Sequence, residues 1–188
     1  MKAKGNYGYL KSLKRIRLIL TLACFAFILI DVLISFIYFQ TNKTLFIVIA
    51  AVMSIPFAKN LIGYLMTFKF EPLTEEEYSE AKQIAEERGL VMVYDVSVTA
   101  SEGILFYPCA AVYNNNVIGL LQKGQNQKKK DASEYLKKVQ ERVKSKPRVI
   151  VVESLKEMQR ELNRLTPPKE DQVKHDRFIA EKLLELGI

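Results

Sequence analysis

Two long apolar runs dominate the first third of the chain. Residues 18–39 contain one charged residue, Asp31, and residues 45–68 also contain one, Lys59. A helix of 22 residues is about 33 Å long, which is enough to cross a hydrocarbon core of about 30 Å. The pattern predicts a basic N-terminus and a two-helix transmembrane hairpin in residues 1–70, with spans at about 18–39 and 45–68.

After residue 70 the pattern changes to shorter helical and strand-like segments, which predict a cytosolic mixed α/β domain over residues 71–188. The first of these helices begins with a capping box at Thr74 and Glu77. The expected elements are a helix over 74–89, strands over 90–99, 104–113 and 117–122, a helix over 131–145, a strand over 148–152, a helix over 154–165 and a helix over 170–186. The order αβββαβαα places the chain in the α+β class.

The connections predict how the four strands pair. Short turns join the first three, one of them at Asn114–Asn116, where Asn tolerates positive φ, so these strands are expected to be antiparallel. A helix separates the third strand from the fourth, which favours a parallel pair. The fourth strand, 148–152, is expected to be buried, and the last helix is expected to turn its apolar residues inward. These residues are Val173, Phe178, Ile179, Leu183 and Leu186.

Charge divides the chain at the same point. Residues 1–70 carry nine Lys or Arg and one acid, while residues 71–188 carry nineteen Lys or Arg and twenty acids. The net charge of +7 therefore belongs to the N-terminal third, and the soluble part lacks the basic excess of a nucleic-acid-binding domain. Six basic residues precede the first span and one lies between the spans, so the positive-inside rule predicts a multi-pass cell-membrane protein with both termini cytoplasmic.

The two charged residues inside the spans form a candidate intramembrane polar pair, because a lone charge in the bilayer is costly. Asp31 and Lys59 lie at heights that an extended lysine side chain can bridge. In the alternative interpretation, Lys59 extends to the headgroups and Asp31 is protonated or bonded to Ser35. A contact with a partner helix, or an ion path built from several copies, are the other hypotheses. Pro56 predicts a kink in the second span.

The soluble part has one basic cluster, formed by Lys123, Lys128, Lys129 and Lys130. It is interpreted as a solvated loop, with contact to anionic headgroups or another polyanion as the alternative. The chain has no P-loop, G-x-G-x-x-G, C-x-x-C or H-E-x-x-H motif, so no cofactor and no metal site is expected. Cys109 is expected to be a buried thiol and His175 a surface residue.

The order αβββαβ over residues 74–152 resembles the core of the restriction-endonuclease-like fold. Nucleases of that fold require an acid on the second strand and an acid-x-Lys sequence on the third, which hold Mg²⁺. Lys123 occupies the lysine position, but Leu121 stands where the acid belongs, and the second strand has no acid. The resemblance therefore implies the fold without its acidic site. Asp95 and Glu102, the nearest carboxylates, are expected to be turn or strand-edge residues.

Three other segments carry a resemblance of the whole chain. They are the start Met1–Lys11, the sequence Pro56–Lys59 in the second span, and Tyr94–Val96 followed by Thr99–Glu102. In these the chain is similar to a family of small, uncharacterised two-span membrane proteins of Gram-positive bacteria. The resemblance implies the two-span topology and no activity.

These observations favour a membrane-anchored cytosolic interaction or regulatory module without catalysis. The first alternative is a degenerate nuclease-like or phosphate-handling enzyme tethered to the membrane. The second is a small subunit of a membrane complex that uses Asp31 and Lys59. The expected partners are the lipid bilayer and a protein, or a second copy of the chain through the spans, and no nucleic acid is expected.

Overall fold

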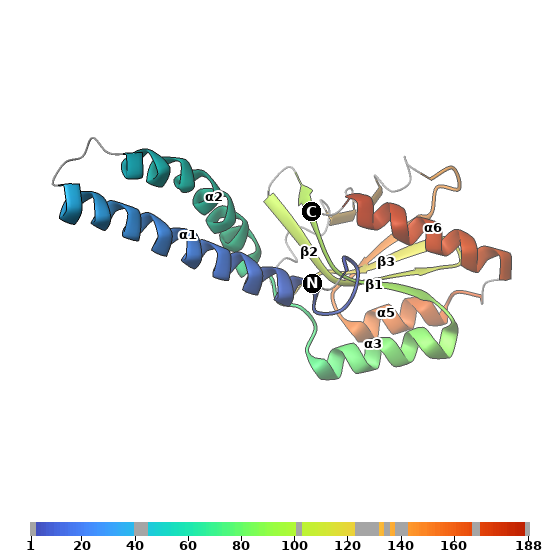
Figure 1. The fold of residues 1–188 in the computed structure, drawn as a ribbon. Coiled ribbons are helices and arrows are strands. Elements are labelled where there is room, and N and C mark those ends of the chain that lie inside the picture. The colour runs from blue at the N-terminus through green and yellow to red at the C-terminus, as the bar shows by residue number, and fades with distance from the viewer. Residues whose placement is uncertain are drawn as a thin grey trace. The chain divides into compact units, whose positions relative to one another are not determined.

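The chain forms two compact units, one helical and one α/β (Figure 1). The structure is a computed structural model that describes residues 3–39, 45–100, 103–122, 132–133, 136–137, 143–166 and 170–186. The helical hairpin comprises Leu10–Lys69, and the α/β unit comprises Met1–Tyr9 together with Phe70–Ile188. The described residues 3–9, which the sequence grouped with the spans, fall in the unit that contains the sheet.

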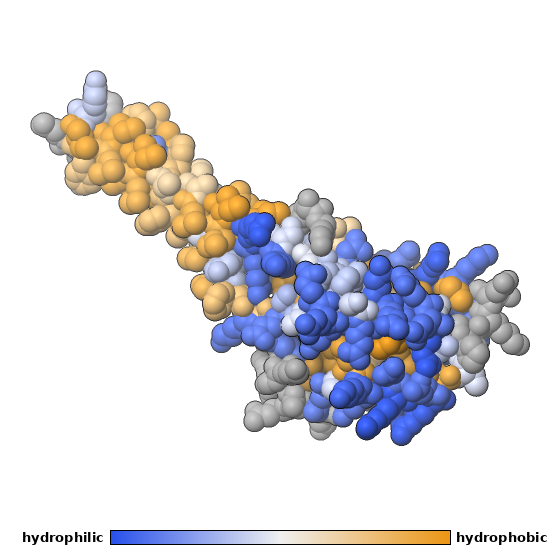
Figure 2. Space-filling view, turned by 90° about the horizontal axis from the view of Figure 1, so that it is seen from below, coloured by the Kyte–Doolittle hydropathy of each residue, from blue (hydrophilic) through white to orange (hydrophobic). Residues whose placement is uncertain are grey.

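The helical hairpin consists of α1, Tyr9–Phe39, and α2, Leu45–Phe68. Both helices are long and apolar enough to cross a membrane, with mean hydropathies of 2.7 and 2.1 over their most apolar 18 residues. Only 22% and 6% of those residues are buried, so neither helix has the surroundings of a core helix in a soluble protein. Figure 2 shows the apolar surface that results. α2 runs through Pro56 and is curved in Figure 1, as expected for a helix that contains proline.

Apart from Leu10 at its start, the buried positions of the helical hairpin are small or polar. They are Thr21, Asp31 and Ser35 of α1 and Ala50 and Thr67 of α2. Small side chains let two helix backbones approach closely, which is how helices pack where the surroundings are as apolar as the side chains.

Two basic residues of α1 donate hydrogen bonds to backbone carbonyl oxygens near the C-terminus of α2. Lys14 Nζ lies 3.1 Å from the carbonyl oxygen of Phe68, and Arg17 Nη1 lies 2.6 Å from that of Gly63. A Cβ atom on Gly63 would lie 3.0 Å from Arg17 Cζ, so glycine makes room for the guanidinium. Cations at a helix C-terminus are favourable because they neutralise the negative end of its dipole. α2 has no basic residue in its own last turn, and α1 supplies the charge instead.

The α/β unit is built on a mixed sheet in the order β1-β2-β3-β4. The strands are β1, Val91–Ala100, β2, Gly103–Tyr113, β3, Asn116–Leu120, and β4, Arg148–Val152. β1, β2 and β3 are antiparallel neighbours and β4 is parallel to β3, which confirms the predicted pairing. Most of the predicted helix over 131–145 lies outside the described residues. Ala132, Ser133, Leu136 and Lys137 are described and helical.

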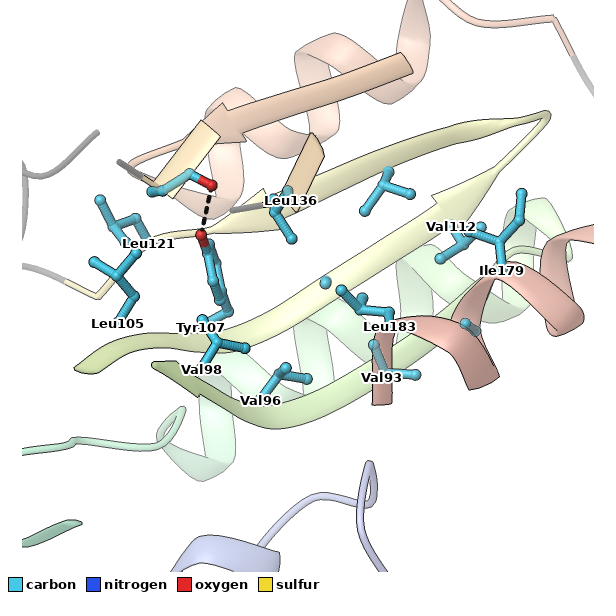
Figure 3. Packing of buried hydrophobic residues seen from close by; sticks show 14 of the residues in the cluster. Val93, Val96, Val98, Leu105, Tyr107, Val112, Leu121, Leu136, Ile179 and Leu183 are labelled. Carbon is cyan, nitrogen blue, oxygen red and sulfur yellow. Dashed lines mark hydrogen bonds between the residues drawn. The ribbon is translucent and has the colours of Figure 1, made fainter. Parts of the chain in front are cut away.

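Helices cover both faces of the sheet (Figure 1). α3, Glu75–Arg88, and α5, Leu155–Asn163, pack on one face around Ile118 and Met158. α6, Glu170–Leu186, packs on the other face. Figure 3 shows this second cluster, in which Tyr107 lies among valine and leucine side chains and its hydroxyl donates to the carbonyl oxygen of Ala132 over 2.9 Å. The result is a three-layer arrangement with a core on each side of the sheet.

Local capping signals set the helix boundaries. The capping box of α3 is present: Thr74 Oγ1 accepts from the Glu77 backbone N–H, and the Glu77 carboxylate accepts from the Thr74 backbone N–H. Gly89 ends the helix at φ 61°. Ser154 caps α5 as predicted, but the Glu157 carboxylate accepts from the backbone N–H of Glu153, one residue before the cap.

Asp95 lies within β1, an edge strand of the described sheet, rather than in a turn, and its backbone φ is 54°. Pro108 lies opposite, between the register pairs Tyr94 with Cys109 and Val96 with Tyr107. Side chains alternate between the two faces of an ordinary strand. Here Val93 and Val96, three positions apart, both point into the hydrophobic cluster beneath α6 that Figure 3 shows, which we call the α6 cluster. They do so because the backbone turns at Asp95.

Two burial predictions were wrong. Phe178 of α6 is 44% exposed, and its ring lies 5.4 Å from Lys182 Nζ. The inward face of α6 carries Asp176 instead, whose carboxylate accepts hydrogen bonds from the backbone N–H groups of Asn114 (2.8 Å) and Asn115 (3.0 Å). β4 is an edge strand of the described sheet, and only its last residue, Val152, is buried.

Candidate functional site

A cleft of about 350 Å³ lies where the α/β unit brings four chain segments together. We call it the strand-end cleft. Its lining comes from the start of α3, from β2 and the end of β3, and from the start of α5. The lining residues are Glu71, Pro72, Leu73, Thr74, Glu77, Glu80, Pro108, Leu120, Leu121, Gln122, Glu153, Ser154, Leu155 and Lys156.

The topology of the sheet places the cleft. β3 ends at Leu120 and the parallel β4 ends at Val152, so the residues that follow each strand leave the sheet at the same edge. In open sheets, ligands bind outside the carboxyl ends of the parallel strands. The strand-end cleft occupies that position.

Two helix N-termini border the cleft, at Thr74 and Ser154. A free helix N-terminus attracts anions because its first backbone N–H groups have no partners. At α3 the Thr74 hydroxyl and the Glu77 carboxylate satisfy donors at 3.2 and 3.0 Å. At α5 the Ser154 hydroxyl and the Glu157 carboxylate do the same, also at 3.2 and 3.0 Å. These donors are therefore already used within the protein.

The charge of the lining is negative. Four carboxylates, those of Glu71, Glu77, Glu80 and Glu153, face one cation, Lys156. The apolar part of the lining consists of four leucines, Leu73, Leu120, Leu121 and Leu155, with Pro72 and Pro108. The strand-end cleft thus combines an acidic rim with an apolar wall.

The cleft includes positions where the resemblance to nucleases would place an acid. Leu121, at the acid position of the third strand, is 1% exposed and packs in the α6 cluster with Leu105 and Tyr107 (Figure 3). The cleft position on the second strand is Pro108. Within the described part of the chain, no three or more His, Cys, Asp or Glu residues are grouped as a metal site requires. Neither Leu121 nor Pro108 offers a carboxylate to a metal ion.

The two charged residues of the predicted spans are not brought into an ion pair. Asp31 is 6% exposed, and its Oδ2 atom has no hydrogen-bond partner among the described residues. Lys59 is exposed. No ion pair joins their side chains, although both are described. The basic cluster Lys123, Lys128, Lys129 and Lys130 lies outside the described residues, as does Glu102.

A Ser–His contact, which the sequence analysis did not anticipate, lies at the opposite end of β3. His175 Nε2 is 2.7 Å from Ser145 Oγ. Ser145 Oγ donates to Asn115 Oδ1 over 2.8 Å, and Asn115 Nδ2 donates back to the Ser145 carbonyl oxygen. Because Asn115 Oδ1 can only accept, the hydroxyl proton is directed at Asn115 and not at His175 Nε2. A nucleophilic serine needs the reverse arrangement, so this contact is structural.

Three tyrosine rings meet in the α/β unit. Tyr7 stacks on Tyr78 with ring centroids 3.9 Å apart, and Tyr94 meets both rings edge-on at 6.4 and 5.2 Å. Burial and then the negative charge of Glu75 raise the pKa of Tyr7, and burial raises the pKa of Tyr94. The hydroxyls of Tyr7 and Tyr94 therefore stay protonated as donors. A second cavity of about 620 Å³ borders these rings, and Gly5, Asn6, Glu75 and Met92 complete its lining.

Cys109 is fully buried, as the sequence predicted. Burial, and then the negative charges of Glu77 and Asp95, raise the pKa of its thiol to about 12. The reactive form of cysteine is the thiolate, so a buried thiol with this pKa is inert near neutral pH.

Comparison with known proteins gives no further guide: no family model, no curated protein and no solved structure matches the chain.

Proposed function

We propose that the chain is a membrane-anchored α/β module that binds a protein partner on the cytoplasmic side and performs no catalysis. One observation carries the proposal. The residues before α1 and those after α2 belong to the same compact unit, and the helical hairpin between them has the length and composition of two membrane spans. A hairpin returns the chain to the side on which it started, so both parts of the α/β unit lie on one face of the membrane.

The charge distribution supports the cytoplasmic side for that face. Lys11, Lys14, Arg15 and Arg17 lie on the first turns of α1, and Lys69 follows α2. Residues 40–44 between the helices carry one basic residue, Lys43. Basic residues are retained on the cytoplasmic side during insertion.

Two features support the lack of catalysis. The cleft residues of the second and third strands have no carboxylates, and the Ser–His contact is not arranged for a nucleophilic serine. Leu121 contributes to the core, Pro108 has no ionisable group, and Ser145 donates its proton away from His175. The strand-end cleft offers shape and charge for recognition.

Two measurements on the full chain test this proposal. After carbonate extraction of membranes, the chain is expected in the pellet, because an integral hairpin resists extraction that releases peripheral proteins. A photo-crosslinking residue at Glu80, on the rim of the strand-end cleft, is expected to capture a discrete partner in native membranes. The same residue at Glu181 of α6, on the other side of the sheet, is the control. Release by carbonate, or identical products from both positions, would contradict the proposal.

Catalysis is tested with the purified full chain in detergent. With Mg²⁺ or Mn²⁺ present, single-stranded and duplex DNA and RNA are expected to remain intact. Cleavage that disappears on Asp95→Asn would show that the acidic site lies elsewhere in the sheet.

A further inference from the structure

We propose that the strand-end cleft binds one basic side chain, an arginine or lysine, presented by the protein partner. This inference rests on the proposed function and names the chemistry of the contact. Four features of the cleft support it: the apolar wall, two exposed carboxylates, helix-cap N–H groups that already donate to side chains, and the volume.

The wall suits the aliphatic part of a basic side chain. Leu73, Leu120 and Leu155 line the cleft together with Pro108. Arginine and lysine carry three or four methylene groups, which bind along apolar surface while the charged group remains at a polar rim. A wall of leucine and proline below a rim of carboxylates matches both parts of such a side chain.

The carboxylates of Glu71 and Glu80 are available to a ligand. Both residues are exposed, and no hydrogen bond or ion pair joins either side chain to another residue of the chain as described. Glu77, in contrast, closes the cap of α3. An arginine pairs with carboxylates through hydrogen bonds assisted by charge, and its planar group can engage two oxygens at once.

The same geometry opposes an anionic ligand. The helix N-termini at Thr74 and Ser154 would be the natural anion sites, but at each a side-chain hydroxyl already accepts from one first-turn backbone N–H, that of Glu77 and that of Glu157. An anion would also approach four carboxylates and one lysine. The charge balance of the lining therefore favours a cation.

The size of the cleft limits how much of the partner it takes. Its volume of about 350 Å³ is at the lower end of the range for ligand pockets, about 300–1,000 Å³. A cleft of this size admits one basic side chain, whereas an extended peptide needs a longer groove. The contact is a single anchor, and its exposed rim makes it sensitive to salt.

The test uses the full chain in dodecyl-maltoside micelles and the probe Nα-acetyl-L-argininamide. Backbone amide signals in ¹H–¹⁵N NMR are expected to shift saturably at Leu121, Gln122 and Lys156, with half-saturation in the millimolar range. Nα-acetyl-L-leucinamide, which keeps the amide groups without the charge, is expected to cause no saturable shift. Raising NaCl from 50 to 500 mM is expected to weaken binding at least threefold.

The double variant Glu71→Gln/Glu80→Gln is expected to weaken probe binding at least fivefold. Glu181→Gln is the matched control, because it removes one carboxylate on the opposite side of the sheet and is expected to change binding less than twofold. Both variants alter exposed side chains and preserve the amide spectrum outside the cleft.

Two outcomes would overturn the inference: no saturable shift in the cleft, or stronger binding of an anion such as inorganic phosphate at the same amides. If either result were obtained while Glu80 still crosslinked a partner in membranes, the inference of a bound basic side chain would be wrong and the proposed function would be unaffected. Saturable probe binding without any crosslinked partner would instead count against the proposed function.

Discussion

The hydroxyl of Tyr7 donates a hydrogen bond to the backbone carbonyl oxygen of Leu73 over 3.1 Å, across 66 positions of the sequence. Tyr7 comes just before α1 and Leu73 comes just after α2. The bond therefore joins the two chain segments that lead into and out of the helical hairpin. The Tyr7 ring also stacks on Tyr78 of α3, which fixes the N-terminal segment to the first helix of the α/β unit.

Replacing Tyr7 tests how strongly this contact holds the N-terminal segment. Tyr7→Phe removes the hydrogen bond and keeps the stack, so we expect a loss of about 0.5–1.5 kcal/mol in the free energy of unfolding. Tyr7→Ala also removes the ring pair, and we expect a loss of about 1–3 kcal/mol. Urea unfolding of the full chain in micelles, followed by circular dichroism, measures both. Equal stability of Tyr7→Ala and the unchanged chain would show that the segment is not docked.

A second contact of the N-terminal segment depends on the absence of a side chain at Gly5. The carbonyl oxygen of Gly5 accepts from the Tyr94 backbone N–H over 2.8 Å at the edge of β1, and Gly5 has a φ of 88°. A Cβ there would lie 2.8 Å from Leu184 Cδ1. Gly5→Ala thus combines backbone strain with a clash, and we expect a loss of about 1–3 kcal/mol.

Gly89 provides the matched control for Gly5. It also has a positive φ, of 61°, but a Cβ would meet nothing within 4 Å. Gly89→Ala should therefore cost only the strain, about 1 kcal/mol. Leu184→Ala should recover part of the stability lost in Gly5→Ala and none of that lost in Gly89→Ala. The same recovery in both backgrounds would mean that Leu184 does not contact the N-terminal segment.

The buried carboxylate of Asp176 is predicted to stabilise the turn between β2 and β3. It accepts from two backbone N–H groups, and hydrogen bonds to a charged group contribute about 1.5–3 kcal/mol. Asp176→Ala should lower the free energy of unfolding by about 2–4 kcal/mol, because both donors lose their partner. Asn114→Gly should cost less than about 1 kcal/mol, because its φ of 47° suits glycine. The opposite ranking in a thermal unfolding series would contradict this role for Asp176.

Asp31 and Lys59 are predicted to act independently. Asp31 is buried within the helical hairpin and Lys59 is exposed. The losses caused by Asp31→Asn and Lys59→Met should therefore add to within about 0.5 kcal/mol in the double variant. Steric-trap or denaturant unfolding of the full chain in micelles measures the coupling. Recovery of stability in the double variant would instead establish the ion pair.

Local signals in the sequence predicted much of the fold. The Thr74–Glu77 box, Gly89 and the Asn114–Asn115 turn each act through backbone groups a few residues away, and each is where it was expected. Strand pairing followed from short turns and one long crossover, because connection length limits the possible topologies.

Long-range contacts were not predictable in the same way. No pattern near Tyr7 indicates that its partners are Leu73 and Tyr78. The positive φ of Asp95 shifts which strand residues face α6, and a simple alternation of apolar residues misses that shift. On α6, the partners of Asp176 lie in a turn 61 positions away or more, so its burial could not be inferred from the helix alone.

The strand-end cleft was also missed, although its parts are visible in the sequence. Two helix starts, at Thr74 and Ser154, and the ends of β3 and β4 were predicted individually. Their convergence depends on the parallel register of β3 and β4, which places Leu120 beside Val152. Only the assembled sheet shows that the acidic residues around α3 and after β4 share one cleft.

Site-specific cysteine labelling in intact cells tests the central claim most directly, namely that the N-terminal segment and the rest of the α/β unit share the cytoplasmic side. In a Cys24→Ser background that retains the buried Cys109, one cysteine at a time replaces Ala3, Asn42 or Glu76, and a membrane-impermeant maleimide is added before or after permeabilisation. We expect Asn42→Cys to react in intact cells, and Ala3→Cys and Glu76→Cys only after permeabilisation. Labelling of Ala3→Cys and Glu76→Cys from opposite sides, or of both from outside, would contradict the account.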